Sequence, residues 1–218
     1  MSSRLRSIEK LPSLPFVNKE TALIVIDMQN DFVSENGYLG KKHRNMKPVQ
    51  DTVVKIKSLL EFCRKNGIIV IFTQTIHFGY TDSDTWKMRS VEKANDLGIC
   101  RQGTPGSEII EEFAPTNEEP VIIKHRYDAF LDTDLDLILR SRGIRNLLIT
   151  GTQTNLCVDT TARHGFMLDY STILVEDCIS TPETEFHLPM IRNFEENFGF
   201  VMPSSKIMEN CSQRSGNR

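Results

Sequence analysis

The stretch that decides the fold is "NLLITGTQTNLCVDTTARHGF", which runs from Asn146 to Phe166. Its first residues form a mostly apolar run that predicts a buried strand, and Gly151 ends that run. A helical pattern begins a few residues later, so the order is strand, turn and helix. Cys157 lies in the turn, and its thiol either packs in the core or is placed there to react.

The same alternation extends through most of the chain. Residues 47–67, 105–113, 133–143 and 183–199 have helical spacing, and a polar segment lies between His77 and Thr104. Strand-like runs cover residues 21–27, 68–75, 120–126, 146–150, 170–177 and, more weakly, 200–204. Alternating strands and helices are typical of right-handed βαβ units that share one parallel sheet.

The pattern therefore predicts a Rossmann-like α/β fold: a doubly wound, mostly parallel six-stranded sheet with helices on both faces. We expect one domain over residues 21–207, preceded by an irregular arm (1–20) and followed by a polar tail (208–218) that frays. In such sheets, ligands bind outside the carboxyl ends of the strands.

Composition excludes several classes of function. The 218 residues carry a net charge of -3 and have a pI near 6.0, which argues against nucleic acid and anionic membrane as partners. No signal peptide is evident at the N-terminus, and the apolar runs are too short to span a bilayer. Five cysteines at irregular spacing, without a CxxC pair, fit a reducing compartment, so we expect a cytoplasmic protein.

Three chemically reactive side chains follow predicted strands. Asp27 ends the first strand, Lys124 ends the third, and Cys157 follows the fourth. Each has an ordinary explanation, because charged residues often end strands and a buried cysteine is usually an inert small hydrophobe. A carboxylate, an ammonium and a thiol at three strand ends are harder to assign to chance, and the fold brings them to one edge of the sheet.

The position of Cys157 strengthens the reactive interpretation. We expect it in the first turn of a helix capped by Thr154 or Asn155, where free N–H groups and the helix dipole favour an anion. A thiol there, close to an ammonium, should have a depressed pKa. The same N–H groups are suited to hold a developing oxyanion.

Three motifs carry a resemblance to a known family. "ALIVIDMQNDF", "IIKHRYDAFLDTDLDLILRSRGI" and "LLITGTQTNLCVDTTARHGFMLDY" occur in this order, and the similarity extends from Thr21 to about Pro203. The sequence resembles the isochorismatase-like cysteine hydrolases, a family of α/β amidases that work through an Asp–Lys–Cys triad. That triad maps onto Asp27, Lys124 and Cys157.

The resemblance also implies a mechanism and a substrate class. A cis peptide would join Thr152 to Gln153, and the backbone N–H groups of Gln153 and Cys157 would form the oxyanion hole. The motifs are most similar to ureidoacrylate amidohydrolases, N-carbamoylsarcosine amidases and biuret hydrolases. We therefore expect a cysteine-dependent amidohydrolase that cleaves a C–N amide bond of a small ureido or carbamoyl compound through a thioester, with no cofactor and no metal.

Substrate contacts are expected from Phe32, Gln74, Trp86 and Tyr127. Gln74 and Tyr127 suit a planar polar group, and Phe32 and Trp86 suit an apolar wall, although packing explains Phe32 and Tyr127 equally well. Residues 77–104 form either a lid that reads a substrate carboxylate or a surface for subunit contacts; their basic residues are Lys87, Arg89, Lys93 and Arg101. Family members usually form dimers or tetramers, so a homo-oligomer is expected.

Other functions remain open. Another small amide such as nicotinamide is one alternative, but His77 stands alone where nicotinamidases carry several histidine ligands. The cysteine argues against the ether-cleaving isochorismatases, which typically lack it. A nucleotide-binding module would need a glycine-rich loop after the first strand, which reads "DMQNDF". A redox-thiol protein would need a partner such as Cys178, and a catalytically inactive scaffold would not need all three triad residues.

Overall fold

A six-stranded parallel sheet forms the centre of the computed structural model, which describes residues 19–42, 44–89 and 98–215. The strands lie in the order β3-β2-β1-β4-β5-β6, and every neighbouring pair is parallel. The bounds are β1 Thr21–Ile26, β2 Ile69–Thr75, β3 Val121–Lys124, β4 Asn146–Thr152, β5 Ser171–Ser180 and β6 Phe200–Met202. The predicted α/β doubly wound fold is confirmed.

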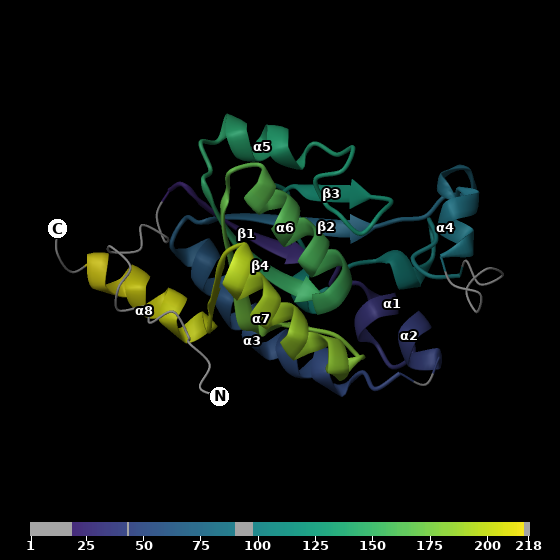
Figure 1. Ribbon diagram of the computed structural model, residues 1–218. Coiled ribbons are helices and arrows are strands. Elements are labelled where there is room, and N and C mark those ends of the chain that lie inside the picture. The colour runs from purple at the N-terminus through teal and green to yellow at the C-terminus, as the bar shows by residue number, and fades with distance from the viewer. Residues whose placement is uncertain (1–18, 43, 90–97, 216–218) are drawn as a thin grey trace.

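Helices cover both faces of this sheet. In the view of Figure 1, α6 (Asp159–Met167) and α7 (His187–Asn197) lie in front of the strands, and α3 (Lys47–Lys65) lies behind them. The β1 side chains alternate between the two apolar cores, because successive strand residues point to opposite faces. Leu23 and Val25 pack with α3, while Ala22, Ile24 and Ile26 pack with α5 (Leu135–Ser141), α6 and α7.

Short helices gather at the carboxyl ends of the strands. These are α1 (Asn30–Val33), α2 (Tyr38–Lys41) and α4 (Asp84–Met88), and the strand arrows of Figure 1 point toward them. Beside them, residues 105–113 do not form the single helix that the sequence predicts. They form two 3₁₀ turns, Pro105–Ser107 and Glu111–Phe113, because the segment between these turns pairs with the loop after β1: Asn30 N–H donates to Glu108 O, and Ile110 N–H donates to Met28 O.

The topological switch point of the sheet lies between β1 and β4. From β1 the strand order runs outward through β2 to β3 on one side, and from β4 it runs outward through β5 to β6 on the other. Gly151 of β4 is required there. Its φ is 111°, and a Cβ at this position would lie 2.0 Å from the carbonyl oxygen of Ile26. The close approach of the two strands brings the residues that follow each of them to the same crevice.

The C-terminal segment differs from its prediction. The expected frayed tail is wrong as far as Ser215, because residues 204–215 form α8 (Ser204–Ser215). The Asp177 carboxylate accepts hydrogen bonds from the N–H and the hydroxyl of Ser204, both at 2.7 Å, and thus caps the start of this helix. Ile207, which is 2% exposed, then packs α8 onto the core. The predicted N-terminal arm lies outside the described residues up to position 18, and no helix in the described ranges is long and apolar enough to cross a bilayer.

Candidate active site

Asp27, Lys124 and Cys157 meet at the carboxyl edge of the sheet, as the sequence predicts. Asp27 directly follows β1, Lys124 ends β3, and Cys157 lies in the turn after β4. Because β2 separates β3 from β1, only a long side chain can reach from one to the other. Lys124 spans this gap, and its Nζ lies 2.7 Å from Oδ2 of Asp27, with both side chains completely buried.

Two threonines of β2 complete what we call the buried ion-pair network: Asp27, Thr73, Thr75 and Lys124. The Thr73 hydroxyl donates to Oδ1 of Asp27 at 2.6 Å, and the Thr75 hydroxyl donates to Oδ2 at 3.1 Å. The Thr75 oxygen also accepts a hydrogen bond from Lys124 Nζ at 2.8 Å. Every oxygen of the carboxylate therefore has a partner, as a buried charge requires.

Sequence reasoning did not find these threonines. They occupy alternate positions of an otherwise apolar strand, and that period of two places both on one face of β2. Gln74 lies between them and so points away. The structure does not bring Gln74 into the pocket, because its Nε2 donates to the carbonyl of Ser107 at 2.7 Å.

The lysine is held in its charged form. Burial opposes the ammonium, but the charges and hydrogen bonds of Asp27 and Cys157 together outweigh burial, and the pKa of Lys124 is raised above its ordinary value. Lys124 Nζ also donates to the main-chain carbonyl of Arg126 at 3.0 Å. The ammonium is thus fixed from both sides and supplies a permanent positive charge at this edge of the sheet.

Cys157 contacts both members of this ion pair, but the predicted depressed pKa is wrong. Burial, with only 6% of the residue exposed, raises the pKa of the Cys157 thiol; Lys124 lowers it and Asp27 raises it again. The favourable effect of one ammonium does not outweigh desolvation and the nearby Asp27 carboxylate. The resting side chain is therefore a thiol that lies beside the Asp27–Lys124 pair.

The helix start predicted around Cys157 also needs correction. A π-turn, η6 (Thr154–Val158), precedes α6, and its cap residue is Gln153, which makes no side-chain capping bond. The Thr154 hydroxyl bonds instead with Nδ1 of His187 at 3.0 Å, so tertiary contact replaces the predicted cap. The Thr152–Gln153 peptide is cis, as expected from the family resemblance. The Gln153 carbonyl accepts the N–H groups of Leu156 and Val158, which flank that of Cys157.

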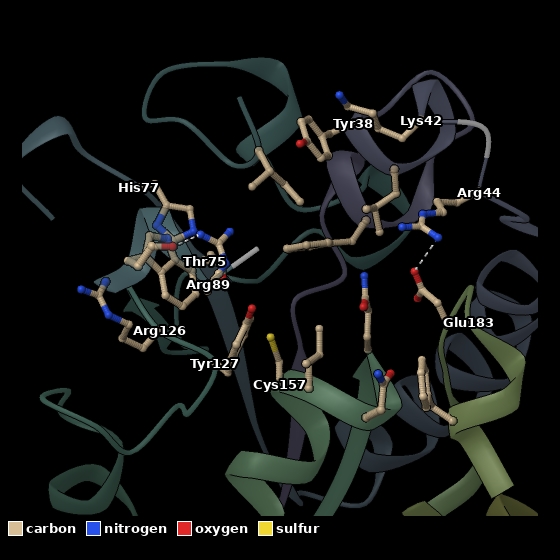
Figure 2. A pocket seen from close by; sticks show the side chains of 18 of the residues that line it. Tyr38, Lys42, Arg44, Thr75, His77, Arg89, Arg126, Tyr127, Cys157 and Glu183 are labelled. Carbon is tan, nitrogen blue, oxygen red and sulfur yellow. Dashed lines mark hydrogen bonds and ion pairs between the residues drawn. The ribbon is translucent and has the colours of Figure 1, made fainter. Parts of the chain in front are cut away.

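A cavity of about 570 Å³ opens beside the thiol. Of the predicted substrate contacts, Phe32, Trp86 and Tyr127 line this cavity together with Cys157 and Gln153. Figure 2 shows Tyr127 next to Cys157, with His77 and Arg89 on the same side of the thiol and Arg44 and Glu183 on the other. The cavity is large enough for a small polar molecule that reaches the sulfur.

The segment that begins at His77 contributes one wall of the cavity. His77 and Arg101 form an isolated bridge, with His77 N–H donating to Cys100 O at 2.8 Å, so the segment leaves and rejoins the domain at one place. His77 lines the cavity and is 4% exposed. Lys93 lies outside the described residues, and Lys87 pairs with Asp84 at 3.7 Å. Within the described ranges, no three His, Cys, Asp or Glu side chains are grouped to hold a metal ion.

The strand order and the buried Asp–Lys–Cys arrangement agree with a family match over most of the chain. Residues 21–206 match the Isochorismatase domain. The chain therefore belongs to the isochorismatase family and is a hydrolase.

Individual relatives point in the same direction. The chain is 35% identical over 208 residues to the ureidoacrylate amidohydrolase RutB of Enterobacter sp. (strain 638), covering 88% of this chain and 90% of that protein. The crystal structure of a cysteine hydrolase from Pseudomonas syringae pv. phaseolicola 1448A matches with a TM-score of 0.80 and 29% identity, over 94% of this chain and 99% of that one. N-carbamoylsarcosine amidase from Thermoplasma acidophilum matches with a TM-score of 0.71 and 27% identity, over 85% and 96% of the two chains.

Proposed function

We propose that this protein hydrolyses a C–N amide bond of a small ureido or carbamoyl compound through a thioester on Cys157. The observation that carries the proposal is the thiol itself, buried at the end of a 570 Å³ cavity and in contact with the Asp27–Lys124 pair. The named activities of the relatives, a ureidoacrylate amidohydrolase and an N-carbamoylsarcosine amidase, favour a urea-like carbonyl as the group that is attacked.

The first half of the reaction forms the covalent intermediate. Asp27 accepts the proton of the Cys157 thiol while the sulfur attacks the urea carbonyl carbon. The backbone N–H groups of Gln153 and Cys157 donate to the oxyanion. The tetrahedral species then collapses: the C–N bond breaks, Asp27 returns its proton to the departing nitrogen, and the amine leaves. A carbamoyl group remains on the sulfur as a thioester.

The second half regenerates the enzyme. Asp27 removes a proton from a water molecule, and the resulting hydroxide adds to the thioester carbon. Collapse breaks the C–S bond, the sulfur recovers the proton from Asp27, and carbamate is released. The sum is one water consumed per C–N bond broken, with no change in oxidation state.

A thiol with a raised pKa is consistent with this scheme because proton removal and attack take place together. Lys124 holds the Asp27 carboxylate in place at 2.7 Å, so the base is positioned before substrate arrives. Burial also removes competing water from the sulfur. The ion pair thereby performs the activation that a depressed thiol pKa performs in other cysteine enzymes.

The test is an ammonia-release screen over ureidoacrylate, N-carbamoyl amino acids, biuret, nicotinamide and simple amides. Cys157→Ala should abolish turnover of the compound that the wild type hydrolyses and leave the free energy of unfolding close to that of the wild type. Cys178→Ala is a matched control, because Cys178 is also fully buried, in β5, and should retain activity. Substantial turnover by the Cys157→Ala protein would exclude the covalent mechanism.

A further inference from the structure

The cavity has one wall whose positive charges have no acidic partners among the residues that the structure describes. This wall is the tryptophan cluster, which we define as Trp86 and the side chains around it: His77, Arg89, Arg126 and Tyr127. The Arg89 guanidinium lies 3.9 Å from the centre of the Trp86 ring, and that of Arg126 lies 4.9 Å from it. The His77 and Tyr127 rings lie 5.3 and 5.0 Å from it.

Other arginines nearby are neutralised. Arg44, which also lines the cavity, pairs with Glu183 at 3.3 Å, and Arg101 pairs with Asp82 at 2.7 Å. Among the residues that the structure describes, no carboxylate pairs with Arg89 or Arg126. Both are half-buried, where an uncompensated charge is costly unless an anion supplies what the protein does not.

Unused hydrogen-bonding groups occur in the same wall. Nε of Arg89 is buried and has no partner in the described part of the chain, although its Nη1 donates to the carbonyl of Trp86. Nδ1 of His77, a residue 96% hidden from solvent, likewise has no partner. Polar atoms that are buried without partners are rare and indicate that a bound group completes them.

Arg126 is held at a set position relative to the reacting atoms. Its side chain donates to His125 O at 2.7 Å and to Thr81 O at 3.1 Å, and its own main-chain carbonyl accepts the ammonium of Lys124. The next residue, Tyr127, lies beside Cys157 in Figure 2. A group bound at the tryptophan cluster therefore lies in the same cavity as the thiol, on the side where Tyr127 is found.

We propose that Arg89 and Arg126 form a carboxylate subsite, so that the substrate is a ureido acid, which is an anion, rather than a neutral urea or amide. This inference rests on the proposed function and specifies it. The arginine pair binds the carboxylate of the leaving group, with His77 as an additional donor, while the urea carbonyl lies over Cys157. Planar guanidinium groups suit a carboxylate, and the electron-rich face of Trp86 keeps them in place.

Binding is measured first, without turnover. The probes are 3-ureidopropionate and its neutral amide, 3-ureidopropionamide, which differ only in the carboxylate. Trp86 is the only tryptophan of the chain and reports binding by its fluorescence in the Cys157→Ala protein. The anion should bind at least tenfold more tightly than the amide, because charge-assisted hydrogen bonds are the strong ones, and added salt should reduce the difference.

The variants locate the effect. Arg89→Gln in the Cys157→Ala background should weaken binding of the anion about tenfold or more and leave the amide within about twofold. Arg89→Lys should be intermediate, because it keeps the charge but loses the planar fork. Arg142→Gln is the matched control: it removes the same charge from an exposed residue that precedes β4, at the opposite edge of the sheet, and should change neither affinity.

Failure of the subsite and failure of the proposed function are distinguishable. Equal affinities for the two probes, or a loss of anion selectivity in Arg142→Gln as large as in Arg89→Gln, would overturn the subsite even if the wild type hydrolyses ureas. Selective binding of 3-ureidopropionate that depends on Arg89 would support the subsite even if no compound of the screen were hydrolysed. In an active wild type, Arg89→Gln should raise KM for ureido acids and change kcat little.

Discussion

The buried ion-pair network and the tryptophan cluster lie beside the same thiol but differ in how their charges are balanced. In the network, the Asp27 carboxylate meets two hydroxyls and an ammonium, and its charge is matched inside the protein. In the cluster, two guanidinium groups stack on Trp86 without an acidic partner among the described residues. Catalysis needs charged groups whose partners lie within the protein, so that they keep their positions when substrate binds. Recognition needs charged groups whose partner is the substrate itself.

The largest expected effect comes from breaking the ion pair. Lys124→Met leaves the Asp27 carboxylate buried without its counter-charge and should cost roughly 3–5 kcal/mol of unfolding free energy, besides abolishing turnover. The double variant Asp27→Asn/Lys124→Met removes both charges and should recover much of that stability while remaining inactive. Urea unfolding and a turnover assay test this together. If the double variant were as unstable as the single one, charge imbalance would not be the cause.

The next prediction concerns His77 of the tryptophan cluster and the change of the free energy of unfolding with pH. Burial lowers the pKa of His77 to about 4, against 6.5 in the unfolded chain. The unfolded chain therefore binds more protons between pH 6.5 and about 4, and this residue makes stability fall as pH falls through that window, by roughly 3 kcal/mol at most. His77→Gln should flatten the fall in urea unfolding measured across these pH values. An unchanged slope would show that other groups determine it.

A smaller loss of stability is expected from Thr75→Val in the buried ion-pair network. It removes a hydroxyl that donates to Asp27 and accepts from Lys124, and it should cost about 2 kcal/mol and lower kcat about tenfold or more. Thr150→Val is the matched control, because Thr150 is also buried and donates only to Ile24 O at 3.0 Å. That control should lose stability but retain kcat, and equal kinetic losses in the two variants would remove the special role of Thr75.

The smallest expected effect concerns the platform of the cluster. Trp86→Phe keeps an aromatic face but weakens its attraction for both guanidinium groups, which is worth about 1 kcal/mol or less. KM for a ureido acid should rise a few-fold, with kcat and KM for a neutral amide unchanged. Steady-state kinetics with the matched acid and amide decide this, and an equal rise for both compounds would make Trp86 a general wall of the cavity.

Much of the fold was readable because its signals are local. Unbroken apolar runs such as residues 21–26 predict strands buried on both faces, and the helices between them have the period of 3.6. The weak run at residues 200–202 also became a strand. The helix predicted at 105–113 failed because its backbone pairs with the loop after β1, and the helix at 204–215 begins at a residue capped by Asp177, which is distant in the sequence.

In the candidate site, too, some features follow from the sequence and others only from the tertiary structure. The sequence by itself determined that a carboxylate, an ammonium and a thiol would share one edge of the sheet, because each directly follows or ends a parallel strand. Only the tertiary structure decided which face of β2 contributes: Thr73 and Thr75 enter the network and Gln74 turns away. It also decided the protonation of Cys157, since burial and the proximity of Asp27 oppose the ionisation that the ammonium of Lys124 favours. Neighbours brought together by folding set both the direction of a side chain and the cost of its charge, and neither is a local property of the chain.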